Sequence, residues 1–227
     1  MQASLAFTYR HKAATEAPSK QTATQRKGRQ KDQEAAEEAN VSDLPARSWR
    51  KPAFREKARQ GKAYGSAVHT LLQYISFTEC SCVQGVEAEI ARLVSRRLLT
   101  EEQGKMLNPE AIFRLFETEM GRKLRCGKEV IREFKFSILE DGSHYGDNLE
   151  GEEVLLQGVV DCAILEDDGI TVIDFKTDAV TEQTLPQLLD RYRPQVQTYV
   201  QALERIYRKP VKAALLYFFG LGQFAEV

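Results

Sequence analysis

The sequence lacks several features that would assign a protein to a class at once. Its 227 residues contain no apolar run of roughly 18 residues and no signal peptide, so neither membrane insertion nor secretion is expected. It also lacks the Gly-x-x-x-x-Gly-Lys-Ser/Thr motif of phosphate-binding loops. We therefore expect an intracellular, cytoplasmic globular protein that carries no ATPase within this chain.

Cysteine is scarce, and its spacing is uninformative for metal binding. Cys80, Cys82, Cys126 and Cys162 do not form paired Cys-x-x-Cys motifs. Reduced thiols are therefore expected, rather than a zinc site or disulfides.

An overall excess of positive charge is also missing. Lysine and arginine number 32 against 33 aspartates and glutamates, so net charge gives no support for nucleic-acid binding. The distribution is more informative, because residues 46–62 hold seven basic residues against the single acid Glu56. This stretch, with Arg50, Lys51 and Arg55 at its centre, either follows a phosphate backbone or forms a solvated linker. The sequence leaves both readings open.

The chain divides by composition near residue 50. Residues 11–40 are rich in Ala, Thr, Gln, Lys and Glu and poor in large apolar residues, which is typical of a mobile or extended segment. We therefore expect residues 1–50 to be a polar linker or N-terminal arm. Residues 51–227 then form the globular domain.

Two apolar strands joined by a tight turn hold the most informative residues. Residues 154–166 and 170–177 read as strands, and Asp168-Gly169 reads as a two-residue hairpin turn. This register places Asp161 opposite Lys176 and Ala163 opposite Asp174. A three-residue loop would instead turn Asp161 toward the core.

With the two-residue turn, three charged side chains leave one face of the hairpin. Asp161, Asp174 and Lys176 share that face, while the opposite face looks like core and carries Val160, Cys162, Ile164, Ile173 and Phe175. Two carboxylates suit Mg²⁺ or Mn²⁺, which could activate water against a phosphodiester, and an ammonium could stabilise the developing charge. The alternative is a cross-strand Asp–Lys salt bridge on a solvated sheet face.

Three further segments resemble ordinary secondary structure when each is taken alone. His69 lies beside a helical apolar stripe formed by Ala67, Val68, Leu71, Leu72 and Ile75. Glu133 lies in a strand whose largely apolar face is formed by Val130, Arg132, Phe134, Phe136 and Ile138. Gln195 and Tyr199 share one face of a helix that we expect to begin at Pro194 and to turn Val196, Val200, Leu203 and Ile206 inward.

Taken in order, these segments resemble the RecB-type branch of the PD-(D/E)XK nucleases. The matching pieces are Tyr64-Gly65-x-x-x-His69, Arg132-Glu133-Phe134, Gly158-x-x-Asp161, Asp174-Phe-Lys176-Thr177 and Gln195-x-x-x-Tyr199. Together they span well over half of the chain. The resemblance implies an α/β (α+β) fold with a mixed central sheet flanked by helices and a restriction-endonuclease-like core, which agrees with the order of the expected elements.

The resemblance also implies roles for these residues. His69, Asp161, Asp174 and the Phe175 carbonyl would bind Mg²⁺, with Mn²⁺ also compatible with an imidazole ligand. Glu133 would line the active site, and Lys176 would be catalytic. Gln195 and Tyr199 would flank it, contacting the lysine or the DNA backbone. No iron–sulfur cluster is expected, because no cysteine follows Tyr199.

The chain resembles in particular the C-terminal nuclease region of helicase–nuclease subunits of the AddA type. That likeness implies a bacterial, nucleoid-associated exonuclease of double-strand-break repair and recombination. It would prefer single-stranded DNA, follow a helicase region of the same polypeptide and work with a partner subunit. A catalytically silent DNA- or partner-binding module on the same fold is the alternative.

Overall fold

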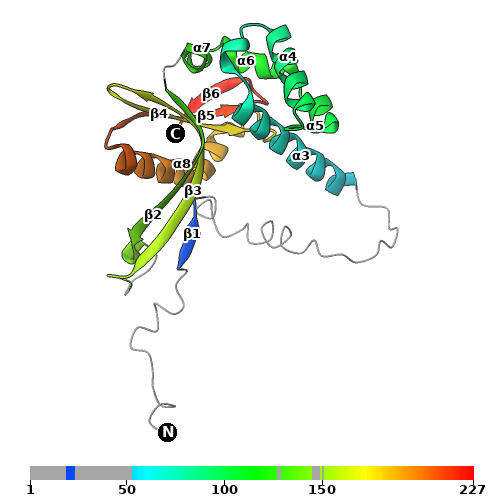
Figure 1. Cartoon of the computed structure of the whole chain (residues 1–227). Helices are drawn as coiled ribbons and strands as arrows, with labels where there is room; N and C mark the ends of the chain where they lie inside the picture. Colours follow the sequence, from blue (N-terminus) through cyan, green and yellow to red (C-terminus); the bar gives the residue numbers. More distant parts are fainter. Residues whose placement is uncertain (1–18, 24–52, 127–128, 145–148, 150) are drawn as a thin grey trace, which may run out of the picture.

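The computed structural model describes residues 19–23, 53–126, 129–144, 149 and 151–227, which form one mixed sheet with helices on both faces (Figure 1). The helices are α3 (Ala53–Tyr74), α4 (Val83–Ser95), α5 (Glu101–Met106), α6 (Pro109–Glu117), α7 (Glu119–Cys126) and α8 (Leu185–Tyr207), with short 3₁₀ turns at Phe77–Glu79 and Gly142–His144. Among the described helices, none combines the length and apolar character needed to span a membrane.

The sheet forks around one long strand. Its strands are β1 (Lys20–Thr22), β2 (Val130–Asp141), β3 (Glu153–Glu166), β4 (Gly169–Lys176), β5 (Val211–Phe218) and β6 (Gln223–Glu226). β2 pairs along one edge of β3, so β1 and β4 share the other edge. On that shared edge, β1 pairs as far as Gln157 and β4 pairs from Cys162 onward. The fork between them exposes the stretch of β3 that contains Asp161.

Helices cover the two faces of the sheet unequally. The apolar stripe expected beside His69 is buried, and it packs with α4, α6 and one face of the hairpin, which presents Cys162, Ile164, Ile173 and Phe175. On the opposite face, Ala163 and Val172 pack against Tyr199 and Leu203 of α8. Figure 1 shows α3–α7 gathered on one side and α8 on the other. The expected mixed sheet flanked by helices is confirmed.

Local sequence signals fix where the small helices begin. Thr100 and Gln103 form a reciprocal capping box at the start of α5. The Asn108 side chain accepts hydrogen bonds from the backbone of Glu110 and Ala111 at the start of α6, just before Pro109.

The register predicted for the hairpin is wrong by two positions. Glu166 pairs with Gly169, so the turn residues are Asp167 and Asp168, and the pairing then runs to Cys162 opposite Ile173. The next position along this register sets Asp161 beside Asp174, not opposite Lys176. Gly169 is the first residue of β4. A Cβ at this position would lie 2.6 Å from Lys212 Cγ and 2.8 Å from the Pro210 carbonyl oxygen, so glycine permits the close approach of the neighbouring segment.

The predicted alternation of β2 is also wrong near its start. Glu133 has a positive φ of 49°, a conformation that non-glycine residues rarely adopt. Arg132 therefore packs toward α3, while Phe134 contacts Tyr207 of α8 on the other face. Val160 of β3 likewise packs on the α8 side, away from Cys162.

Two predictions about α8 need correction. The helix begins at Leu185 rather than at Pro194, and Pro186 supplies the proline of its first turn. Pro194 lies inside the helix, and its carbonyl accepts a hydrogen bond of 2.8 Å from Thr198 Oγ1. Ile206 is 41% exposed, so it does not face the core.

Part of the N-terminal arm belongs to the sheet. Within the segment that we expected to be a linker, Lys20, Gln21 and Thr22 pair in parallel with residues 155–157 of β3. Ala23 is buried, and its backbone N–H donates to the Gln157 carbonyl. Residues 1–18 and 24–50 lie outside the described part of the chain.

Candidate active site

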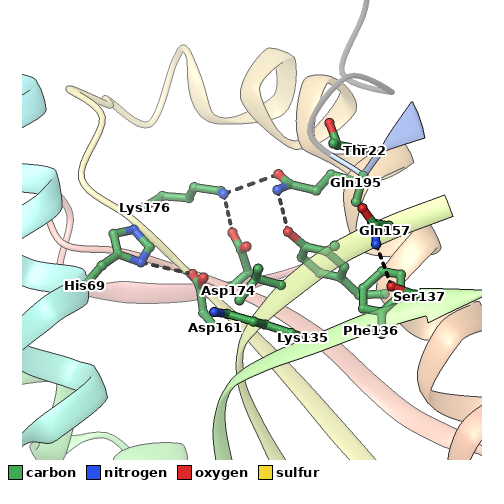
Figure 2. Close-up of a pocket in the computed structure, with 14 residues that line it drawn as sticks. Thr22, His69, Lys135, Phe136, Ser137, Gln157, Asp161, Asp174, Lys176 and Gln195 are labelled. Carbon is green, nitrogen blue, oxygen red and sulfur yellow. Dashed lines mark hydrogen bonds and ion pairs between the residues drawn. The ribbon is translucent and has the colours of Figure 1, made fainter. Parts of the chain in front are cut away.

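A pocket of about 650 Å³ opens at the fork of the sheet. Its walls come from β1, β2, β3, β4, α3 and α8, and Figure 2 shows the side chains that line it. At one end lie His69, Asp161, Asp174, Lys176, Gln195 and Tyr199. The pocket therefore joins residues from separate sequence segments that we predicted to act together.

Three potential metal ligands meet beside this end of the pocket. One atom each from His69, Glu133 and Asp161 lies within 4.8 Å of the other two. His69 Nδ1 is 3.5 Å from Asp161 Oδ2. Glu133 reaches this group from the position of positive φ, so the backbone strain and the acidic side chain occur at one residue.

The carboxylates of this group are held in an unfavourable environment. Burial, followed by the nearby negative charge of Asp174, raises the pKa of Asp161 well above its usual value, although Lys176 and the Phe175 N–H oppose the shift. Burial also raises the pKa of Glu133, against the effect of Lys135. A bound cation would relieve both conflicts.

Asp174 and Lys176 form a buried ion pair next to the three ligands. Their carboxylate and ammonium groups are in direct contact, and the residues are only 1% and 8% exposed. A salt bridge on a solvated sheet face, the alternative raised by the sequence, does not describe this pair, because α8 covers it. Burying two charges is costly, which favours a specific use for them.

A chain of polar contacts leads from Lys176 into α8. Its Nζ donates to Gln195 Oε1 at 3.4 Å, and Gln195 Nε2 donates to Tyr199 Oη at 2.6 Å (Figure 2). Tyr192, one turn earlier, places its ring 4.3 Å from the same Nζ. The Tyr192 hydroxyl donates to Asp178 Oδ2 at 2.6 Å. These contacts fix the direction of the lysine side chain.

Arg132 ties α3 to β2 behind the site. Its guanidinium donates to the carbonyl oxygens of Leu72 and Ile75 at 3.1 and 2.6 Å, and lies 4.6 Å from the centre of the Phe77 ring. Leu72 and Ile75 lie at the end of the helix that carries His69, and Arg132 precedes Glu133. One side chain thus links the elements that supply two of the three ligands.

Two glycines of the predicted motifs permit close packing around the pocket. A Cβ at Gly65 would lie 2.8 Å from Thr177 Oγ1, so α3 approaches the end of β4 closely. A Cβ at Gly158 would lie 2.5 Å from the Phe136 ring, which packs edge-on against Tyr199. Glycine at these two positions therefore permits the close approach of Thr177 and of the Phe136 ring.

Most of the predicted site residues come together, but not all can be placed. Arg50 and Lys51 lie outside the described residues, and only the backbone of Arg55 is described, within α3. The backbone N–H of Phe175 donates to Asp161 Oδ2 at 2.9 Å, whereas metal binding by its carbonyl stays a prediction. Asp174 contacts Lys176 and is not part of the three-ligand group.

Sequence reasoning missed three contributors to the site. Lys135 lines the pocket, Tyr192 contacts Lys176, and Arg132 holds α3. Arg132 lay within one of the predicted motifs, and an arginine inside an apolar strand was itself a signal. Lys135 and Tyr192 gave no such signal, because their roles depend on neighbours from other elements.

The donor set fits a hard divalent cation. Asp161 and Glu133 offer carboxylate oxygens, and His69 offers an imidazole nitrogen that is compatible with Mn²⁺ and less usual for Mg²⁺. Burial is the main cause of the raised pKa of both acids, and the nearby Asp174 carboxylate adds to it. These three residues, with Asp174 alongside, are the candidates for holding a metal.

Comparison with known protein families agrees with this geometry. The family model described as "PD-(D/E)XK nuclease superfamily" matches residues 41–223. The chain belongs to this superfamily. Its restriction-endonuclease-like fold accounts for the forked sheet, the buried Asp–Lys pair and the flanking helices.

Individual proteins that are similar to this chain point to one group within the superfamily. An "ATP-dependent helicase/nuclease" subunit from Bacillus mycoides (strain KBAB4) is 35% identical over 95% of this chain, which covers 18% of that protein. The protein of the same name from Bacillus cereus (strain AH820) is 35% identical over 98% of the chain and 19% of its own length. The chain thus spans less than a fifth of these relatives. The match to a solved structure titled "Crystal structure of SSO0001" covers 64% of this chain and 63% of that chain at 18% identity, with a TM-score of 0.34.

Proposed function

We propose that this superfamily member is an active, Mg²⁺-dependent deoxyribonuclease with exonuclease activity, in which Mn²⁺ can replace Mg²⁺. The observation that carries the proposal is the meeting of His69, Glu133 and Asp161 beside the buried Asp174–Lys176 pair, which lines the pocket. A silent binding module would have no need of a buried lysine held by α8, because such a pair is costly to keep.

The roles of the residues follow from their contacts. His69, Glu133 and Asp161, assisted by Asp174, would hold the cation, which when bound lowers the pKa of a water and polarises a phosphate. The Lys176 ammonium stabilises negative charge that builds on the scissile phosphate. Gln195, Tyr199 and Tyr192 keep that ammonium directed into the pocket.

We further propose that the chain works as the nuclease region of a helicase–nuclease subunit in double-strand-break repair. Support comes from the names of the relatives and from the short part of them that this chain matches. A helicase region of the same polypeptide, with a partner subunit, would feed single-stranded DNA to the pocket in the bacterial cytoplasm, at the nucleoid. Tethering raises the local substrate concentration to about millimolar, so no strong DNA site is needed here.

The test is cleavage of end-labelled single-stranded and blunt duplex DNA by the 227-residue chain with Mg²⁺, Mn²⁺ or EDTA. We expect slow cleavage that requires the metal and favours single strands. Lys176→Ala should lower the cleavage rate at least ~100-fold, in the range of lost electrostatic stabilisation of a transition state, with little change in DNA affinity. A Lys176→Ala protein that cuts normally would overturn the mechanism, and a folded wild type that binds but never cuts would favour the silent module.

A further inference from the structure

The pocket extends well beyond the residues that the proposed chemistry uses. Its second end is lined by Thr22, Ser137 and Gln157, and the Lys135 side chain points from there toward Asp161 (Figure 2). These four residues come from β1, β2 and β3, and we call them the β1-side arm. No role in the cleavage step falls to any of them.

Three of these polar residues form a row across the sheet. Thr22 pairs with Gln157, and Gln157 pairs with Ser137, so the three side chains lie side by side on adjacent strands. Gln157 Nε2 donates to Ser137 Oγ at 2.7 Å, which fixes the orientation of the amide. The row offers hydroxyl and amide groups suited to sugar and phosphate oxygens.

Lys135 lies between this row and the metal-ligand group. It is exposed, and it lines the pocket together with Asp161 and Asp174. Lys135 and Lys176 are the lysines that line the pocket. A polyanion that enters past Glu133, Asp161 and Asp174 needs such a cation to offset their charge.

The spacing along β2 suits successive units of a nucleic-acid backbone. Lys135 and Ser137 lie two residues apart in the regularly paired part of β2, a step of about 6.5–7 Å, and Glu133 lies beyond Lys135 at the position of positive φ. That step is comparable to the separation of neighbouring phosphates in an extended single strand. The metal-ligand group, Lys135 and the polar row therefore follow one another in this order along β2.

We propose that the β1-side arm binds the single-stranded backbone beside the bond being cut. Lys135 binds the phosphate next to the scissile one, and Thr22, Ser137 and Gln157 hold the following sugar and phosphate. This inference rests on the proposed nuclease function and gives the N-terminal strand β1 a part in substrate binding. Bases remain outside these contacts, so the arm selects no sequence.

A double-mutant cycle that combines the loss of one lysine with the neutralisation of one phosphate tests the proposal. Fluorescent single-stranded oligonucleotides would carry one neutral methylphosphonate at successive positions on either side of a defined cleavage site. kcat/KM would be measured for the wild type, Lys135→Ala and the control Lys105→Ala, in which the exposed lysine lies on α5 at a distance from this pocket. Lys135 is not part of the apolar core, so its variant should fold normally.

With the native oligonucleotide, Lys135→Ala should lower kcat/KM up to about fivefold, as expected for a solvent-accessible ion pair, and Lys105→Ala should not. With one of the methylphosphonate oligonucleotides, whose neutral position lies within two nucleotides of the cut, Lys135→Ala should have the same kcat/KM as the wild type. For Lys135→Ala, the slope of the logarithm of the binding constant against the logarithm of the salt concentration should become shallower by about 0.7. Ser137→Ala with Gln157→Ala should raise KM and spare kcat.

The results separate this inference from the proposed function. A wild-type chain that cuts no oligonucleotide contradicts the nuclease proposal itself. Cleavage by the wild type with equal effects of Lys135→Ala at every methylphosphonate position, or with equal losses for Lys105→Ala, overturns the arm alone.

Discussion

At the scale of single residues, the surroundings of Asp161 disfavour the ionised form of its carboxyl group. Burial and the nearby carboxylate of Asp174 raise its pKa well above the usual value of 3.8. The folded state therefore holds this proton more tightly than the unfolded chain does. As the pH rises from about 4 through the raised pKa, the metal-free protein loses stability, and above that pKa the loss is complete.

Asp161→Asn should remove this penalty. In EDTA at neutral pH, we expect the variant to have a higher Tm than the wild type, because the neutral amide can still accept the Phe175 N–H bond. The difference should shrink as the pH approaches about 4, where the unfolded carboxyl also gains a proton. Thermal melts across that range would check it. A lower Tm for the variant at neutral pH without metal would contradict the assignment.

Tyr192 offers a second test at this scale, because it acts on Lys176 in two separable ways. Its ring faces the ammonium at 4.3 Å, and its hydroxyl bonds Asp178. Tyr192→Phe keeps the ring, so we expect a cleavage rate within about twofold of the wild type. Tyr192→Leu should lower kcat by up to about tenfold, the range of a desolvated cation–π contact.

Single-turnover rates at saturating DNA would measure both variants. A structural role alone would lower the Tm of both and leave the kcat of the folded protein unchanged. Equal kcat losses in the two variants would argue that the hydroxyl, not the ring, directs the lysine.

At the scale of elements, the site depends on how α3 is fastened to β2. Arg132 bonds two carbonyl oxygens at the end of α3 and neighbours the strained Glu133. Removing it leaves those carbonyl groups without their partner in the protein interior. The distance between His69 and Glu133 would then be less well defined.

We expect Arg132→Met to destabilise the protein by about 2–4 kcal/mol, since unpaired buried polar groups cost about 1–3 kcal/mol each. Arg122→Met is the matched control, because Arg122 bonds one carbonyl, that of Glu117, at an exposed position. Its loss should cost below about 1 kcal/mol. Urea denaturation would give both values.

Mn²⁺ titration of the folded Arg132→Met protein should also show weaker binding, while Arg122→Met binds normally. Similar destabilisation by both variants would contradict a special role for Arg132. So would unchanged Mn²⁺ affinity in Arg132→Met.

At the scale of the whole molecule, much of the architecture could be predicted, because the apolar periodicities are clear and the ordered motifs resemble those of a known family. The stripe beside His69, the strand pair around Asp161 and the α8 face with Gln195 and Tyr199 all follow from spacing. The hairpin register was wrong by two positions, an even number. An even slip preserves the alternation of side chains, so the faces of Asp174 and Lys176 were still correct.

Other features depend on packing that no local pattern encodes. The positive φ at Glu133 turns β2 over, and nothing in Arg132-Glu133-Phe134 indicates it. The short strand β1 lies in a polar segment and forms only because the edge of β3 accepts it. Lys135 and Tyr192 gain their positions from the fold. These residues could be found only once the elements were assembled around the fork.

The central claim is that the fork of the sheet binds a divalent metal, and Mn²⁺ located by anomalous diffraction in crystals of the chain tests it most directly. The account predicts a peak at the catalytic end of the pocket, coordinated by Asp161 and His69, with Glu133 or Asp174 completing the acidic ligands and Lys176 alongside. Saturating Mn²⁺ with no peak in this pocket, or with a peak that does not contact Asp161, would contradict it.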